Sequence, residues 1–308
     1  MSILDSLIKD CPVRKSARQK ESFRGFITDT LAKKNIEARV ERTKNGKNDN
    51  IVIGNPESAK VIFTAHYDTP CASLFPNIMI PRNLLLFWLY QFLPLIALVG
   101  ISLLGGYLVG ISVLGSYEAF LVCFLALYYG GYFLGFRTFE NKNNANDNTS
   151  GVATVMSIIE RLDDATLGST AFILFDNEEK GKKGSKAYFA DHADFMKDKL
   201  LINFDCVGVG EHIVFIAKPE AEAREEYRAL YESFNDDGKY TVHFYGTRGS
   251  ESNSDYKSFP LGVGCMACKS TKGGLLYTPD IHTSRDVTAS NDNIIYIADG
   301  VCEFIRRI

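Results

Sequence analysis

Four apolar, strand-like runs of the sequence end in histidine or carboxylate side chains, which can bind a metal ion. These side chains are His66 and Asp68 after the first run, Glu178 and Glu179 after the second, Asp205 after the third and, less directly, His282 after the fourth. In open α/β sheets, ligands gather beyond the carboxyl ends of the strands. We therefore expect these residues to converge in space although they lie far apart in the sequence.

A set of histidine and carboxylate ligands suits zinc, and a carboxylate that bridges two such ions about 3.5 to 4 Å apart is the usual hydrolytic arrangement. A single histidine or aspartate at the end of a strand is more often a solvated loop residue or a helix cap. That interpretation becomes much weaker when five such positions occur in one order among glycine and threonine residues. The pattern predicts a hydrolytic metal centre.

Five segments resemble, in the same order, the motifs of the M28 metallopeptidase family. They are Ala65-His66-Tyr67-Asp68-Thr69, Asn146-Asp147-Asn148-Thr149-Ser150-Gly151, Phe175-Asp176-Asn177-Glu178-Glu179-Lys180-Gly181 with Gly184-Ser185, Asn203-Phe204-Asp205 and Ile281-His282-Thr283. Each segment alone is suggestive, whereas the ordered set is highly specific. The resemblance extends from about residue 50 to the C-terminus, apart from an insertion. It implies an α/β fold like that of the zinc exopeptidases, with a mixed β-sheet sandwiched by helices.

The resemblance also implies two Zn²⁺ ions as cofactors and a set of ligands for them. His66 and Asp205 would bind one ion. Glu179 and His282 would bind the other, and Asp147 would bridge both. The implied substrate is a peptide with a free N-terminus, from which such aminopeptidases remove residues.

Two further carboxylates have implied roles next to the metal ions. Glu178 resembles the family's general base, which takes a proton from the attacking water and passes it to the leaving amine. Asp68 resembles a carboxylate that orients His66 without binding metal itself. Because side chains alternate along a strand and the strand is ending at this point, we expect Glu178 and Glu179 to point to different sides.

One segment departs from the family's pattern. Ser254-Asp255-Tyr256, followed by Phe259-Pro260, resembles an SDH-x-x-F stretch near the substrate pocket, but Tyr256 stands in the place of the histidine. The resemblance therefore leaves the shape of the substrate pocket open.

The rest of the sequence predicts the elements that position these residues. Apolar runs alternate with amphipathic stretches, which is the pattern of α/β layers. Strands are predicted at residues 36–42, 50–54, 61–66, 170–175, 200–204, 213–217 and 263–267, and the first two form a hairpin around a turn. Helices are predicted at residues 16–34, 151–162, 220–234 and 291–308.

An insertion at residues 84–136 divides the predicted catalytic domain into residues 1–83 and 137–308. Its 53 residues contain one charge, Glu118, whereas the remaining 255 residues carry the other 70 charges. Because roughly 20 apolar residues span a bilayer as a helix, we expect two transmembrane helices, at 84–104 and 117–136. The predicted connection contains Gly105, Gly106, Gly110 and Gly115. The alternative, a pair of buried core helices, would need a polar face, which these segments lack.

The order of the motifs and the positions of basic residues predict a topology. Two spans return the chain to the side it left, as required because His66 precedes the insertion and Asp147 follows it. Arg82, Arg137 and Lys142 flank the base of the hairpin, whereas its tip has no basic residue. The positive-inside rule then places the catalytic domain in the cytoplasm, in agreement with an N-terminus that does not read as a secretory signal.

Composition limits the kinds of partner. The chain has 34 basic and 37 acidic residues and a net charge of −3, so it lacks the overall excess of basic residues that is typical of nucleic-acid-binding proteins. Seven cysteines, an odd number in a chain too large to need disulfides, favour reduced thiols in the cytosol. The expected partners are peptide substrates and the lipid bilayer.

Two alternatives to the aminopeptidase remain. One is an acyl transferase like the glutaminyl cyclases, which resemble this fold and use one zinc ion. The other is a catalytically inactive membrane receptor or scaffold on the same fold. The complete set of ligands for two metal ions favours the peptidase over both.

Overall fold

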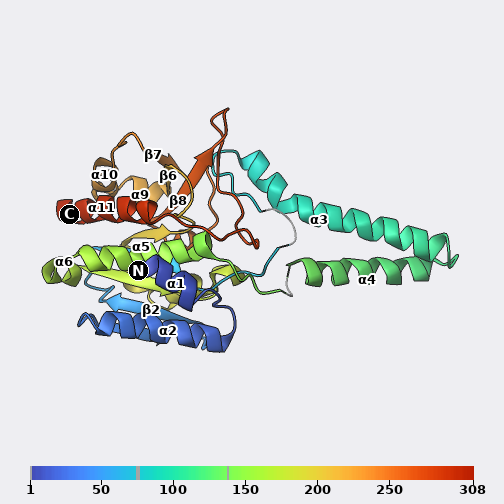
Figure 1. Cartoon of the computed structure of the whole chain (residues 1–308), viewed down its shortest axis with the longest axis horizontal. Coiled ribbons are helices and arrows are strands. Elements are labelled where there is room, and N and C mark those ends of the chain that lie inside the picture. The colour runs from blue at the N-terminus through green and yellow to red at the C-terminus, as the bar shows by residue number, and fades with distance from the viewer. Residues whose placement is uncertain (1, 74–76, 137–138) are drawn as a thin grey trace.

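The computed structural model describes residues 2–73, 77–136 and 139–308. The described residues form a mixed sheet of nine strands between two layers of helices, and a helical hairpin projects from this α/β body (Figure 1). This architecture agrees with the mixed sheet expected from the sequence.

Parallel strands in the centre of the sheet determine where the site lies. The strand order is β1-β2-β4-β3-β5-β8-β6-β7, with β9 paired to β8. The bounds are β1 Ala38–Arg42, β2 Asp49–Gly54, β3 Val61–His66, β4 Thr170–Phe175, β5 Leu200–Phe204, β6 His212–Ala217, β7 Thr241–Gly246, β8 Gly262–Ser270 and β9 Leu276–Tyr277. Strands β4, β3, β5 and β8 are mutually parallel, and every residue of β3, β4 and β5 is buried, as expected for strands covered on both faces. Their carboxyl ends therefore meet at one edge of the sheet.

Helices cover both faces of the sheet. One face packs against α1 Ile3–Asp10, α2 Ala17–Ala32, α5 Gly151–Arg161, α10 Glu225–Glu232 and α11 Asn291–Arg307, and the other against α7 Lys183–Asp191 and α8 Ala193–Met196. Along strand β3, successive side chains point to opposite faces of the sheet, so the strand contacts both helix layers. Phe63 packs against Phe304 of α11, with ring centroids 6.3 Å apart, whereas Ile62 belongs to the apolar cluster that contains Tyr188 of α7.

The predicted elements differ from the structure in a few places. Each predicted strand is present, but the single helix predicted at 220–234 is wrong. That segment forms α9 Pro219–Glu222 and α10, because the backbone of Arg224 between them is extended, with φ −88° and ψ 144°. The short helices α1, α6 Asp164–Gly168, α7 and α8 and the strands β7 and β9 were not predicted.

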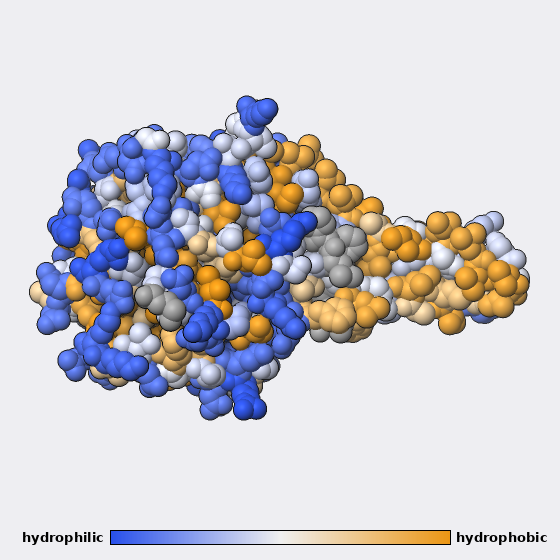
Figure 2. All heavy atoms as spheres, in the orientation of Figure 1, coloured by the Kyte–Doolittle hydropathy of each residue, from blue (hydrophilic) through white to orange (hydrophobic). Residues whose placement is uncertain are grey.

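The inserted segment forms two long antiparallel helices. Helix α3 spans Leu84–Gly106 and continues through a π-helical turn at Tyr107–Ile111, and α4 spans Tyr117–Phe136. Both are long and apolar enough to cross a membrane. Figure 2 shows apolar residues over most of the projecting surface, and side chains such as Leu85 and Val113 are 78% and 74% exposed. These helices are therefore not a pair buried in the core of the body.

Three of the glycines that were predicted to form the connection instead lie in helical turns. Gly105 and Gly106 end α3, and Gly110 lies in the π-helical turn that follows. A Cβ atom at Gly110 would lie 2.2 Å from the backbone nitrogen of Phe120, so only glycine allows the two helices to approach this closely. Of the four glycines, only Gly115, with φ +65°, lies in the connection itself.

Candidate active site

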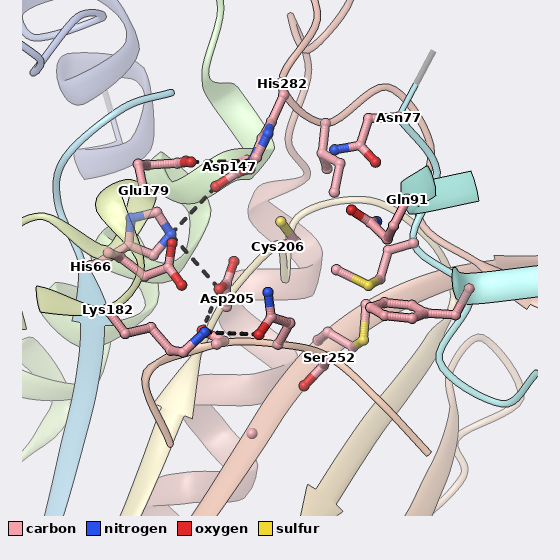
Figure 3. A pocket seen from close by; sticks show the side chains of 18 of the residues that line it. His66, Asn77, Gln91, Asp147, Glu179, Lys182, Asp205, Cys206, Ser252 and His282 are labelled. Atoms are coloured by element: carbon pink, nitrogen blue, oxygen red, sulfur yellow. Dashed lines mark hydrogen bonds and ion pairs between the residues drawn. The ribbon is translucent and has the colours of Figure 1, made fainter. Parts of the chain in front are cut away.

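The site lies where the central strands end, and it collects side chains from five segments. His66 is the last residue of β3, and Asp205 directly follows β5. Glu178 and Glu179 begin a 3₁₀ turn after β4. Asp147 lies in the turn at Ala145–Ser150 before α5, and His282 lies in the loop between β9 and α11. Figure 3 shows the labelled members of this set gathered on one side of a cavity.

The two oxygens of Asp147 face different histidines. Oδ1 lies 3.4 Å from Nε2 of His66, which is also 3.7 Å from Oδ2 of Asp205. Oδ2 lies 2.9 Å from Nε2 of His282, which is also 3.4 Å from Oε2 of Glu179. His66, Asp147 and Asp205 thus form one group with metal-ligand spacing, and Asp147, Glu179 and His282 form a second. The structure brings all five predicted ligands together, with Asp147 common to both groups.

The burial of these groups is consistent with a bound cation. Oε1 of Glu179 is buried and has no hydrogen-bond partner among the described residues. Burial raises the pKa of Glu179 to about 8 despite the opposing effect of His282. Burial also raises the pKa of Glu178 well above its ordinary value, against the effect of His66. A cation would stabilise the ionised carboxylates, and imidazole nitrogens with carboxylate oxygens are ligands that zinc prefers. The residues present therefore fit zinc.

Asp68 connects the histidine at the end of β3 with the two glutamates. Its carboxylate accepts hydrogen bonds from the backbone N–H groups of Glu178, at 2.9 Å, and Glu179, at 3.2 Å. Nδ1 of His66 lies 3.1 Å from the backbone carbonyl oxygen of Asp68 and 3.7 Å from its carboxylate. The side chain expected from the sequence to orient His66 thus also holds the glutamate turn in place.

The prediction that Glu178 and Glu179 alternate as neighbours at the end of a strand is wrong. Strand β4 ends at Phe175, so alternation along a strand does not apply to these residues. Asn177 has a left-handed backbone, with φ 55°, and opens the 3₁₀ turn Glu178–Lys180. Both side chains thus leave this turn, and Glu178 lies close enough to His66 and Glu179 to form a third group with ligand spacing.

Asp286 is a site residue that sequence reasoning missed. Its two carboxylate oxygens accept hydrogen bonds from the backbone N–H groups of Asn146, at 2.7 Å, and Asp147, at 2.9 Å. Asp286 therefore fixes the backbone that carries the shared carboxylate. The only signal in the sequence is its place four residues after His282, which does not indicate a contact with a segment so far away in the chain.

Arg14 is a second residue that the sequence analysis did not identify. Its side chain is fully buried, and Nη1 donates to the carbonyl oxygen of Cys11 at 2.7 Å. Burial lowers the pKa of Arg14 to about 10, and the charges of Asp68, Asp147 and Asp286 act in the opposite direction. Arg14 thus supplies a buried positive charge near the carboxylates that surround the site.

We expect Asp286→Ala to destabilise the protein. The change leaves two buried N–H groups without an acceptor, and each costs about 1 to 3 kcal/mol, so the free energy of unfolding should fall by about 2 to 6 kcal/mol. Urea unfolding of the metal-free protein in detergent measures this change. The control is Asp299→Ala, which removes a carboxylate that is 64% exposed and pairs with Arg161, and which should change stability by less than about 1 kcal/mol. Equal effects of the two changes would contradict the role of Asp286.

A cavity of about 230 Å³ lies next to the proposed ligands, and Glu178 and Ser254 are among the residues that line it. The hydroxyl of Ser254 donates to Oδ2 of Asp205. The carboxylate of Asp255 is buried and accepts from the hydroxyl of Ser185 at 2.5 Å. Tyr256, which replaces the histidine of the family's pattern, is not among the lining residues and packs in the core against Gly264.

A family model described as peptidase family M28 matches residues 135–305, which is more than half of the chain. The chain belongs to this family. M28 peptidases typically bind zinc, and this M28 chain has a candidate metal site of histidine and carboxylate side chains. The match leaves out His66 and Asp68, which the fold brings to the same site.

Solved structures support the fold of this M28 chain at low sequence identity. LapA of Legionella pneumophila has a TM-score of 0.57 and 13% identity, over 99% of this chain and 70% of LapA. A glutaminyl cyclase of Porphyromonas gingivalis has a TM-score of 0.57 and 14% identity, over 99% of this chain and 96% of the cyclase. A Zn-dependent exopeptidase of Parabacteroides distasonis has a TM-score of 0.57 and 15% identity, with the same coverage of 99% and 96%. The comparison with curated proteins gives no match.

Proposed function

We propose that this chain is a zinc-dependent aminopeptidase that hydrolyses N-terminal residues from peptides. The observation that carries the proposal is the position of Asp147, whose two oxygens face His66 and His282 in two groups of candidate ligands. Glu178 lines the cavity next to these groups. The arrangement suits hydrolysis at two metal ions with a separate carboxylate as the base.

The site residues would have separate roles in peptide hydrolysis. Two zinc ions, held by His66, Asp147, Glu179, Asp205 and His282, would lower the pKa of water toward about 7 and polarise the scissile carbonyl group. Glu178 would accept the proton of the attacking water and return it to the leaving amine. Asp68 would keep Glu178 in position through the hydrogen bond to its backbone N–H.

A panel of aminoacyl fluorogenic substrates tests this proposal. Each substrate is offered to the purified protein with a free amine and in N-acetylated form, with and without a chelator. The proposal expects release of the fluorophore only from substrates with a free amine, and loss of activity with the chelator that added zinc restores. Cleavage of the acetylated substrates, or activity that survives complete removal of metal, would contradict it.

We further propose that the α3–α4 hairpin anchors the enzyme in a membrane, with the catalytic domain in the cytoplasm. Two exposed apolar helices of sufficient length support the anchor. The side of the membrane is inferred from Arg82 and Lys142 at the base of the hairpin, together with Arg137, which lies outside the described residues. Because residues of α3 line the cavity, the proposed substrates include N-termini presented at the membrane surface.

Labelling of single cysteines tests this topology. In a cysteine-free background, we expect an impermeant maleimide to label a cysteine that replaces Ser112, at the tip, in intact cells. A cysteine that replaces Lys47, in the turn between β1 and β2, should react only after the cells are permeabilised. Labelling of the Lys47 position alone would reverse the orientation. Extraction of the protein by carbonate without detergent would exclude the membrane spans.

A further inference from the structure

The inserted hairpin contributes residues to the cavity beside the metal ligands. Phe87 and Gln91, which are four residues apart on one face of α3, both line it. Phe87 is 1% exposed, whereas Trp88 and Leu89 next to it are 48% and 47% exposed. Gln91, one turn further along, borders the cavity but is exposed, so the start of α3 packs against the catalytic body through Phe87.

Several contacts fix the start of α3 relative to the site. Nη1 of Arg82 donates to the hydroxyl of Ser250 at 3.0 Å, and its guanidinium lies 4.2 Å from the ring centroid of Tyr245. The N–H of Glu251 donates to the carbonyl oxygen of Pro81 at 2.9 Å. The same loop continues into residues 252–254, which line the cavity. These contacts thus attach the start of α3 to a loop that forms part of the cavity wall.

The side of the cavity away from the ligands is uncharged. Figure 3 shows Asn77 and Gln91 on the side opposite His66 and Glu179. Besides these two amides and Phe87, the lining includes the apolar side chains of Met79, Met266 and Ile281. Lys182, a charged lining residue, lies on the side of the ligands in Figure 3, and its Nζ donates to Oδ1 of Asn253 at 2.8 Å.

We propose that α3 is part of the substrate site, and that Phe87 and Gln91 form the far wall of the pocket for the N-terminal side chain. The proposal rests on the aminopeptidase function proposed above. The pocket selects an uncharged, chiefly apolar side chain such as leucine. Against the buried ring of Phe87, a lysine or glutamate side chain would lose water without gaining a partner of opposite charge. Each methylene group that fits an apolar pocket improves discrimination between substrates by roughly 10- to 200-fold.

Binding of amino-acid hydroxamates to the zinc-loaded, full-length protein in detergent tests this proposal separately from turnover. Calorimetry should show that leucine hydroxamate binds more tightly than lysine hydroxamate. Gln91→Glu should raise the affinity for lysine hydroxamate relative to leucine hydroxamate by about tenfold or more, because a charge-assisted hydrogen bond becomes available. Gln91→Leu, which removes the amide without adding charge, should not improve the binding of lysine hydroxamate.

A matched pair of substitutions tests the other wall residue. Phe87→Ala should enlarge the pocket and shift the affinity ratio from leucine toward phenylalanine hydroxamate, whereas Phe92→Ala, at a residue that is 50% exposed on the same helix, should leave the ratio unchanged. Unchanged ratios in both Gln91→Glu and Phe87→Ala, or no binding of leucine hydroxamate by the wild type, would overturn the proposal. Selective binding without any peptide hydrolysis would instead overturn the proposed function and leave the pocket assignment intact.

Discussion

Replacing Glu178 by glutamine is expected to remove nearly all turnover while the protein keeps both zinc ions. The amide preserves the shape of the side chain but cannot accept a proton from water, and loss of a general base typically costs roughly 10² to 10⁴ in rate. The measurement combines kcat on a leucine fluorogenic substrate with elemental analysis of bound zinc. Glu57→Gln, at an exposed glutamate in the turn before β3, is the matched control and should behave as wild type.

Two outcomes would contradict this assignment. A kcat like that of the wild type in the metal-loaded Glu178→Gln protein would exclude Glu178 as the base. Loss of zinc together with activity would place Glu178 among the ligands instead, an arrangement that its spacing from His66 and Glu179 would permit.

Asp147→Ala is expected to lose metal as well as activity. Because this carboxylate belongs to both groups of candidate ligands, its removal takes one ligand from each proposed zinc site. The zinc affinity should fall by more than about 100-fold, beyond the 10- to 100-fold loss typical of residues that only support a ligand. Competition with a chelator of known affinity measures the change. Asp286→Ala, which removes only the support of the Asp147 backbone, should weaken zinc binding less.

Retention of two tightly bound zinc ions by Asp147→Ala would remove this residue from the centre of the site. An equal loss of affinity in Asp147→Ala and Asp286→Ala would show that the backbone of this turn, rather than the carboxylate of Asp147, determines binding.

The sequence predicted the proposed ligands because each lies in a short local pattern. His66 ends one apolar run and Asp205 follows another; both runs form buried strands, and parallel pairing brings the ends of those strands together. The support around the ligands was not predictable in this way. Asp286 accepts hydrogen bonds from backbone N–H groups that lie 139 and 140 residues away in the sequence. Arg14 donates to a backbone carbonyl oxygen and contributes a buried charge. No local sequence pattern indicates either interaction.

The hairpin was predictable as two apolar helices, but its contribution to the cavity was not. Hydropathy identifies α3 and α4 without indicating the direction in which they leave the body. That direction depends on contacts such as the one between Arg82 and Ser250, which join distant segments. Likewise, only the packing of Gly110 against Phe120 shows that this glycine serves helix contact rather than the connection.

Mass spectrometry of the products from an unlabelled peptide tests the central claim most directly. Two peptides, one beginning with leucine and one with glutamine, are incubated with the zinc-loaded protein and with its Glu178→Gln variant. The account predicts that the wild type releases the free N-terminal amino acid and a peptide shorter by one residue, and that the variant releases almost none. A product of unchanged length that has lost ammonia from its N-terminal glutamine, or two intact peptides after incubation with fully zinc-loaded wild type, would contradict it.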